Sequence, residues 1–131
     1  MKKKPRHKLS PANLEIMKII WDKGELTITE VLKTINKKRT HPLRRTTVQV
    51  QMARLEEYRW LKRRKKGRTY YYSAIAGKQK TKRDILDDIK TRVFGGSRTE
   101  LVRCLLEDVH INSEEIEELR ELIQSHNKVK T

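Results

Sequence analysis

Positive charge is concentrated in one short segment of the sequence, KRRKKGR, at residues 62–68. Six of its seven residues are Lys or Arg, and cations this close repel one another unless an anion lies nearby. Residues on both sides alternate in the manner of β-strands, which predicts a hairpin that turns at Lys66-Gly67. We therefore expect Lys65, Lys66 and Arg68, at its tip, to bind the phosphates of a nucleic acid.

A second set of residues with recognition chemistry precedes this segment on a predicted helix. Three apolar residues recur there at helical spacing and should face a core: Val48, Met52 and Leu55. The opposite face then carries Thr46, Val50, Ala53, Arg54 and Glu57, and its edges carry Thr47 and Gln49.

Three of these side chains suit the edges of bases in the major groove. Gln49 can pair bidentately with adenine, and Arg54 can reach guanine or a phosphate. An exposed valine in a helix is weakly unfavourable, but the methyl groups of Val50 could contact the methyl group of thymine. An exposed Val50 could equally be an ordinary scattered surface residue, so only its combination with the basic hairpin favours DNA.

The elements that must position these residues can be predicted from caps and periodicity. Ser10 followed by Pro11 starts a first helix, and Thr27 with Glu30 forms a capping box for a second. The apolar residues expected to share one face of the first helix are Leu14, Met17, Ile20 and Trp21. A third helix should begin at residue 46 or 47 and end near residue 58, and the hairpin should span residues 61–73.

The tyrosines of the hairpin indicate which of its faces is buried. Tyr70 and Tyr72 point to one face and Tyr71 to the other, and we expect the first two to lie inside. Three helices followed by a basic hairpin predict a winged helix-turn-helix. In this fold the third helix enters the major groove while the hairpin reaches the backbone or the minor groove alongside.

The charge of the chain divides it into two parts. The 131 residues contain 32 Lys and Arg against 17 Asp and Glu, a formal charge of +15. Residues 1–75 hold 21 basic and 6 acidic side chains, and residues 76–131 hold 11 of each. We therefore predict a DNA-binding domain over 1–75, which includes a basic N-terminal tail, and a separate domain over 76–131. The tail is either a solvated segment or an arm that contacts phosphate.

The second half has the pattern of three short amphipathic helices. Three helices in some 55 residues are too little to bury a good core, so their apolar faces should meet a second copy of the chain. The alternative is that they fold back on the winged domain. The residues expected to dimerise are Leu86, Ile89, Val93, Leu101, Leu105, Ile116, Leu119, Leu122 and Ile123. The lone Cys104 shares a helix with Leu101 and Leu105 and should be a small buried thiol.

Several other classes of protein lack support in the sequence. One cysteine excludes an internal disulfide, and no apolar run is long enough to span a bilayer or to form a signal peptide, so we expect a cytoplasmic protein. We expect no metal or other cofactor, because the four histidines have no ligand spacing. No Gly-rich phosphate loop, nucleophile motif or HExxH argues for an enzyme. A non-specific binder of RNA or DNA is the stronger rival, although 5% aromatic residues provide little for bases to stack on.

The sequence resembles the penicillinase repressor family, which includes BlaI and MecI and has the copper-responsive CopY repressors as relatives. The similar segments cover nearly the whole chain in order: LEIMKIIW, TITEVLKTI, RTTVQVQMARLEEYRWLKRRKKGRTYYYS, VFGGSRTELV and SEEIEELRELI. The resemblance implies a homodimeric repressor that binds a pseudo-palindromic operator overlapping a promoter. It also implies groove-reading positions at Thr47, Gln49, Val50, Ala53 and Arg54.

The resemblance further implies a way of relieving repression. In antibiotic-responsive members, a membrane-bound protease sensor leads to cutting of the repressor within its dimerisation half. The corresponding cut would fall near Cys104-Leu105. The family's site has an asparagine before a phenylalanine, and this sequence has neither there. The cysteine-rich tail of the copper-sensing relatives is missing from this sequence.

Overall fold

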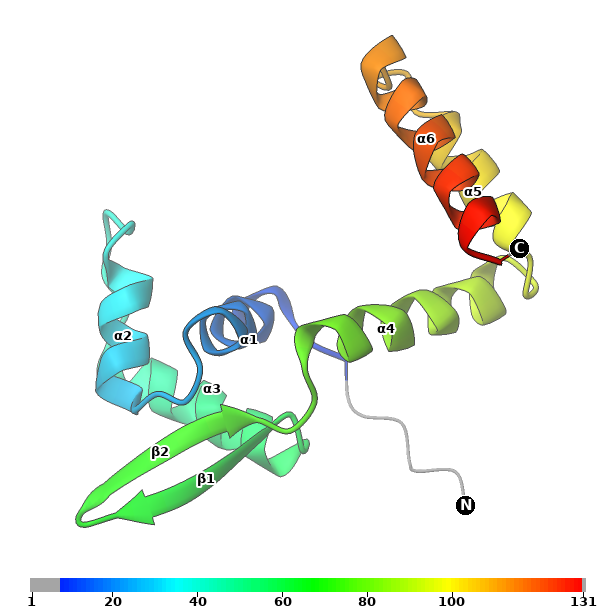
Figure 1. Ribbon diagram of the computed structural model, residues 1–131. Coiled ribbons are helices and arrows are strands. Elements are labelled where there is room, and N and C mark those ends of the chain that lie inside the picture. Colours follow the sequence, from blue (N-terminus) through cyan, green and yellow to red (C-terminus); the bar gives the residue numbers. More distant parts are fainter. Residues whose placement is uncertain (1–7, 131) are drawn as a thin grey trace. The chain divides into compact units, whose positions relative to one another are not determined.

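The computed structural model describes residues 8–130, so the predicted basic tail lies mostly outside the described residues (Figure 1). These residues form six helices and one antiparallel hairpin: α1 (Pro11–Lys23), α2 (Ile28–Asn36), α3 (Arg45–Glu57), β1 (Leu61–Lys66), β2 (Thr69–Ala74), α4 (Lys78–Val93), α5 (Arg98–Leu106) and α6 (Ser113–Lys130). The predicted class, mostly helical with a small hairpin, is confirmed. The chain divides into two units, of which the first ends at Arg83 and the second begins at Asp84. The charge pattern had suggested a boundary between residues 75 and 76.

The first two helices begin at the predicted capping residues. The hydroxyl oxygen of Ser10 accepts a hydrogen bond of 3.1 Å from the backbone N–H of Asn13, and Pro11 occupies the first turn. At α2, the Thr27 hydroxyl accepts from the Glu30 N–H at 3.2 Å, and the Glu30 carboxylate accepts from the Thr27 N–H at 3.0 Å. This reciprocal pair is the capping box that the sequence predicted.

The three helices and the hairpin enclose one hydrophobic core. Its members are Ile16, Met17, Ile20, Leu26, Val31, Ile35, Val48, Met52, Leu55, Trp60, Leu61 and Tyr72. The three residues predicted for the inner face of α3 are fully buried, which fixes the rotation of that helix about its axis. Of the residues expected to share one face of α1, Met17 and Ile20 are buried and Trp21 packs half-buried against the core, whereas Leu14 is only half-buried. The fully buried Ile16 was not among them.

A left-handed residue ends α3 and turns the chain into the hairpin. Arg59 has φ of +64°, its N–H donates to the Glu56 carbonyl at 3.0 Å, and the Trp60 N–H donates to the Leu55 carbonyl at 2.8 Å. These two bonds form a Schellman motif, and the buried side chains of Leu55 and Trp60 supply its usual apolar contact. The end of α3 and the start of β1 are therefore joined by a short, well-defined connection.

The hairpin pairs Leu61 with Ala74 at its base and Lys66 with Thr69 at its tip. Its loop is therefore Gly67-Arg68, one residue later than predicted, and Gly67 adopts a φ of +64° that suits glycine. Tyr72 is 4% exposed, and it exchanges backbone hydrogen bonds of 2.8 and 3.0 Å with Leu26.

The expectation that Tyr70 would also lie inside was wrong. It shares the face of Tyr72 but is 38% exposed. Tyr70 pairs with Lys65, four residues along β1 from the buried Leu61, and the core does not extend that far toward the tip.

The first turn of α4 belongs to the first unit. The indole N–H of Trp21 donates to the Ala76 carbonyl at 3.0 Å, and the Thr81 hydroxyl donates to the Gly77 carbonyl at 2.8 Å. Ala76 is 8% exposed and Thr81 is 2% exposed, so both are held inside. Packing of the first unit thus continues past the end of the hairpin.

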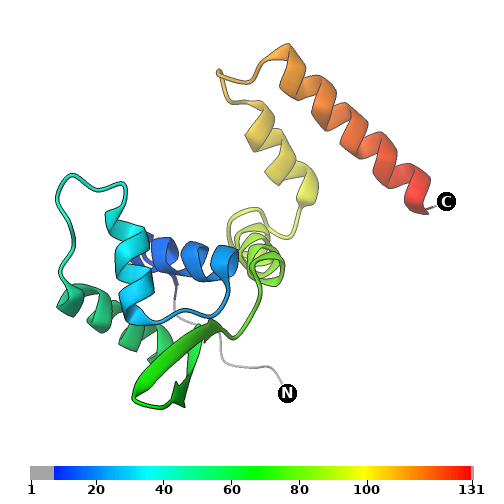
Figure 2. The same ribbon diagram turned by 60° about the vertical axis from the view of Figure 1, so that its left-hand side comes forward.

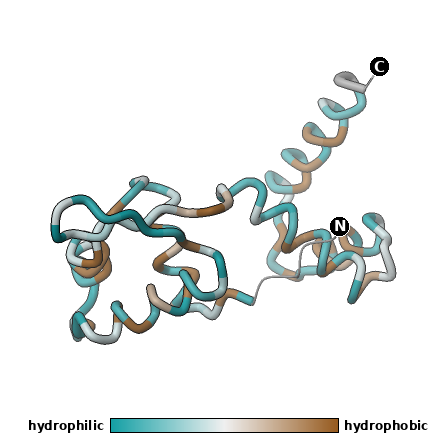
Figure 3. The backbone as a smooth tube through the Cα atoms, turned by 90° about the horizontal axis from the view of Figure 1, so that it is seen from below, coloured by the Kyte–Doolittle hydropathy of each residue, from teal (hydrophilic) through white to brown (hydrophobic). Residues whose placement is uncertain are grey.

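The second unit, by contrast, contains no buried side chain among residues 84–127. Its helices are well capped, since the Ser97 hydroxyl and the Asn112 side-chain oxygen accept backbone N–H groups at 3.1 and 2.9 Å. Helices α5 and α6 do not pack closely on each other (Figure 2). Apolar residues nevertheless recur along α6, the helix that leads to the C-terminus (Figure 3). None of the helices in the described part of the chain is long and apolar enough to cross a membrane.

Candidate nucleic-acid interface

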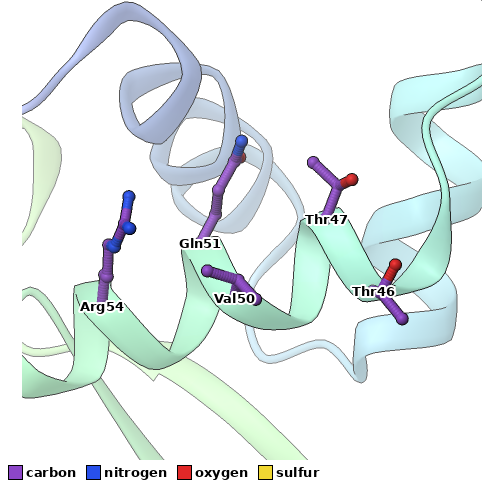
Figure 4. Close-up of a pocket in the computed structure, with 5 residues that line it drawn as sticks. All are labelled: Thr46, Thr47, Val50, Gln51 and Arg54. Carbon is purple, nitrogen blue, oxygen red and sulfur yellow. The ribbon is translucent and has the colours of Figure 1, made fainter.

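The outer face of α3 forms an open pocket (Figure 4). The pocket is lined by Thr46, Thr47, Val50, Gln51 and Arg54. The side chain of Val50 is 52% exposed although it is apolar, and it lies between the two threonines and Arg54 along the helix. The pocket therefore offers methyl, hydroxyl, amide and guanidinium groups on one surface, which are the groups that read base edges.

The structure separates the predicted reading residues into two sets. Four of them line the pocket, whereas Gln49 and Ala53 are exposed but lie outside it. Sequence reasoning missed Gln51, which is half-buried and lines the pocket between Thr47 and Arg54. Helical spacing could have found it, because residues 47, 51 and 54 follow the i, i+4, i+7 pattern of a single face.

The polar groups of the pocket are free to bind a ligand. Within residues 8–130, no hydrogen bond or ion pair engages the side chain of Gln51 or Arg54. At the start of the same helix, by comparison, the Arg45 guanidinium donates to the Thr29 hydroxyl at 2.6 Å and so ties α3 to α2. The cation and the amide in the pocket are thus available, while the arginine outside it has a structural partner.

Two of the six cations in the hairpin are held by carboxylates. The guanidinium of Arg64 makes two hydrogen bonds of 2.8 Å to the two carboxylate oxygens of Glu25. This contact, reinforced by the charges of Lys62 and Lys66, holds the pKa of the Glu25 carboxyl below its usual value. Both groups are at the surface, so the pair fixes the direction of Arg64 more than it adds stability.

Arg63 is occupied on the other face of β1. Its guanidinium lies 3.1 Å from a carboxylate oxygen of Glu56 and 4.2 Å from the centre of the Tyr70 ring. A hydrogen bond to Tyr72 and the nearby Glu56 charge raise the pKa of Arg63. The ion pair also connects the last turn of α3 to the hairpin.

The remaining cations of the hairpin point to solvent. Lys62, Lys65, Lys66 and Arg68 are all exposed, and none has an ion pair within the part of the chain that the structure describes. Arg68 lies in the two-residue loop itself, and the Lys65 ammonium is 5.8 Å from the centre of the Tyr70 ring. The tip therefore carries three uncompensated cations, at the positions that the sequence analysis assigned to phosphate.

The residues predicted to dimerise are mostly exposed. The exposed fraction is 64% for Leu105, 65% for Leu122 and 70% for Val93, whereas Leu101 is half-buried. The expectation that Cys104 is a buried thiol was wrong for the single chain, because Cys104 is exposed on α5, a helix that buries none of its residues.

Comparison with known proteins identifies the family. The profile described as "Penicillinase repressor" matches residues 9–125. The chain belongs to the penicillinase repressor family. It is 29% identical to the penicillinase repressor of Bacillus licheniformis over 96% of this chain and 95% of the relative. Identity with the penicillinase repressor of Staphylococcus aureus is 27%, over 92% of this chain and 94% of the relative.

A solved DNA-binding domain is similar to part of the chain. The DNA-binding domain of the repressor BlaI is 30% identical, with a TM-score of 0.50, and the match covers 58% of this chain and 90% of that one. The winged-helix fold and the resemblance predicted from the sequence are thereby confirmed. This member of the penicillinase repressor family is a sequence-specific DNA-binding transcriptional repressor, and such repressors are not a class of enzymes.

Proposed function

We propose that this repressor acts as a homodimer on a pseudo-palindromic operator in the cytoplasm. Helix α3 enters the major groove of each half-site, and the tip of the hairpin contacts the adjoining phosphate backbone. Cutting of the second unit by a sensor-linked protease then separates the two DNA-binding units and relieves repression. The observation that carries the proposal is the uncovered apolar surface of α4–α6 in a single chain.

The apolar surface supports dimerisation through its extent and its position in the chain. Twelve large apolar side chains between residues 85 and 123 are more than a third exposed: Ile85, Leu86, Ile89, Val93, Val102, Leu105, Leu106, Val109, Ile116, Leu119, Leu122 and Ile123. Large apolar side chains that stay this exposed in a single chain are typical of an interface with another molecule. A second copy supplies the same surface, and its two-fold symmetry matches a pseudo-palindromic site.

The first unit supports the assignment of the DNA-contacting residues. We assign base contacts to Thr46, Thr47, Gln49, Val50, Ala53 and Arg54 on α3, all of which are exposed. Phosphate contacts are assigned to Lys65, Lys66 and Arg68, which have no internal counter-charge among the described residues. Base contacts of this kind give sequence specificity, and the phosphate contacts give affinity and register.

The proposed site of proteolysis is the bond between Cys104 and Leu105. Both side chains are exposed, but the bond lies within the last turn of α5. A protease needs an extended backbone, so the end of α5 must unfold locally before cutting. Cutting there would detach α6 and most of the apolar surface from the DNA-binding unit.

Substitution of Leu122 by Glu in the full-length chain tests the dimer. The change places a charge in the proposed interface, so we expect monomers in sedimentation velocity and weaker binding to the full operator, with little change for a half-site. Gln124→Glu, which adds the same charge at an exposed polar position of α6, serves as the matched control. A Leu122→Glu chain that still dimerises and binds like the wild type would contradict the proposal.

A further inference from the structure

The pocket on α3 contains one polar residue that the groove-reading set above does not include, Gln51. Its side chain lies in the row formed with Thr47 and Arg54, as Figure 4 shows. It is half-buried, so the surrounding surface restricts its stem more than that of a fully exposed glutamine. A restricted side chain loses less freedom on binding, which favours a specific contact.

The chemistry of the pair Gln51 and Arg54 is suited to two particular bases. A glutamine amide can donate to N7 and accept from the N6 amino group of adenine in one bidentate pair, and an arginine can donate to both O6 and N7 of guanine. Neither side chain has a hydrogen bond or ion pair to another residue in the described range 8–130, so the amide of Gln51 and the guanidinium of Arg54 can both turn toward the groove.

The spacing of the two residues sets the distance between the bases. They are three positions apart on one helix, and in zinc-finger helices residues three positions apart contact successive bases. We propose that Gln51 is a specificity-determining residue that reads an adenine in the base pair next to a guanine read by Arg54. The inference rests on the proposed entry of α3 into the major groove.

Gln49 cannot make the same contact. Two residues along a helix correspond to a rotation of about 200°, so Gln49 and Gln51 project to opposite edges of α3. Gln49 also lies outside the pocket that Arg54 lines. If both glutamines read bases, they must act on different base pairs, and their substitutions can be told apart by position.

The test is selection from a randomised duplex library with the full-length chain at one salt concentration. The variants are Gln51→Met, which keeps the length of the side chain and removes the amide, and Arg54→Ala; Gln124→Met on α6 is the matched control. We expect Gln51→Met to lose about 5- to 150-fold preference for one adenine in each half-site. That position should adjoin the guanine whose preference disappears in Arg54→Ala, and the control should return the wild-type site.

Gln51→Glu gives an independent measurement, because a carboxylate accepts a hydrogen bond from the amino group of cytosine. We expect this variant to replace adenine by cytosine at the same position. A wild-type site that survives both substitutions at Gln51, in variants that melt like the wild type, would overturn the inference and leave the proposed repressor intact. If the wild-type chain selects no site at all, the proposed function itself fails.

Discussion

Both units of this protein are built from amphipathic helices, but within residues 8–127 only the first unit buries their apolar faces in a core. In the first, α1–α3 and the hairpin bury twelve residues in a single core. In the second, capped helices of comparable length bury nothing among residues 84–127. Amphipathicity and capping therefore define the helices in both units, but they do not determine whether a unit is complete on its own.

Topology accounts for the difference. The hairpin returns the chain across the helices of the first unit, and Leu26 pairs with Tyr72 to close the core. Within residues 84–127, α5 and α6 have no such third layer, and they do not pack closely on each other. A sheet or helix face must be buried against another layer to be stable, so in our proposal the second unit obtains that layer from its dimer partner.

Removal of the second unit should have the largest effect on operator binding. A chain that ends at Arg83 retains the whole core, including Ala76 and Thr81, and should fold as a monomer. We expect its affinity for the full operator to fall by roughly 100-fold or more, because the second half-site is no longer bound at high effective concentration. Sedimentation measures the oligomeric state, and titration of the operator measures the affinity. A truncated chain that still dimerises at micromolar concentration would refute the assignment of dimerisation to the second unit.

Truncating one apolar side chain in each unit should change thermal stability in two different ways, one independent of protein concentration and one dependent on it. Met52→Ala leaves a cavity in the first core and should lower the free energy of unfolding by about 2–5 kcal/mol at any protein concentration. Leu119→Ala should act through the dimer, so its effect on the melting temperature should change with protein concentration. Thermal unfolding at several concentrations makes the comparison, and concentration-independent melting of both the wild type and Leu119→Ala would argue against the dimer.

The smallest expected effect concerns the cations of the hairpin. Replacement of Lys65, Lys66 and Arg68 by Ala should weaken binding to all duplexes about equally and reduce the salt slope by about 0.9 for each phosphate that is no longer neutralised. Arg64→Ala is the matched control, because Arg64 is held by Glu25 and should contribute little to the slope. An unchanged slope in the triple variant would remove the phosphate assignment.

Local signals in the sequence were sufficient for much of the first unit. The caps at Ser10 and Thr27, the inner face of α3 and the existence of the hairpin all depend on residues within a few positions of each other. The identity of the central residue of α1 depends instead on where α2 and the hairpin approach it, which is why Ile16 was missed. Tyr70 was misplaced for a similar reason, since alternation gives the face of a strand but not the edge of the core.

Part of the candidate site could also be predicted from local sequence patterns. Helical periodicity indicates which residues lie on the outer surface of α3. Extending that surface to the neighbouring row of residues would have included Gln51. The pairing of Arg64 with Glu25 joins residues 39 positions apart, and no local pattern distinguishes Arg64 from its basic neighbours. A run of charges in the sequence therefore overstates the number of cations that are free to contact DNA.

The positions of the aromatic residues determine which unit can be followed by absorbance and fluorescence. Both tryptophans, at positions 21 and 60, and all four tyrosines, at 58 and 70–72, lie in the first unit, and the second contains only Phe94. Near-ultraviolet absorbance and intrinsic fluorescence therefore report on the DNA-binding unit alone. A fragment released from the C-terminal side of Cys104 would carry no such signal, and its detection would require peptide-bond absorbance or mass spectrometry.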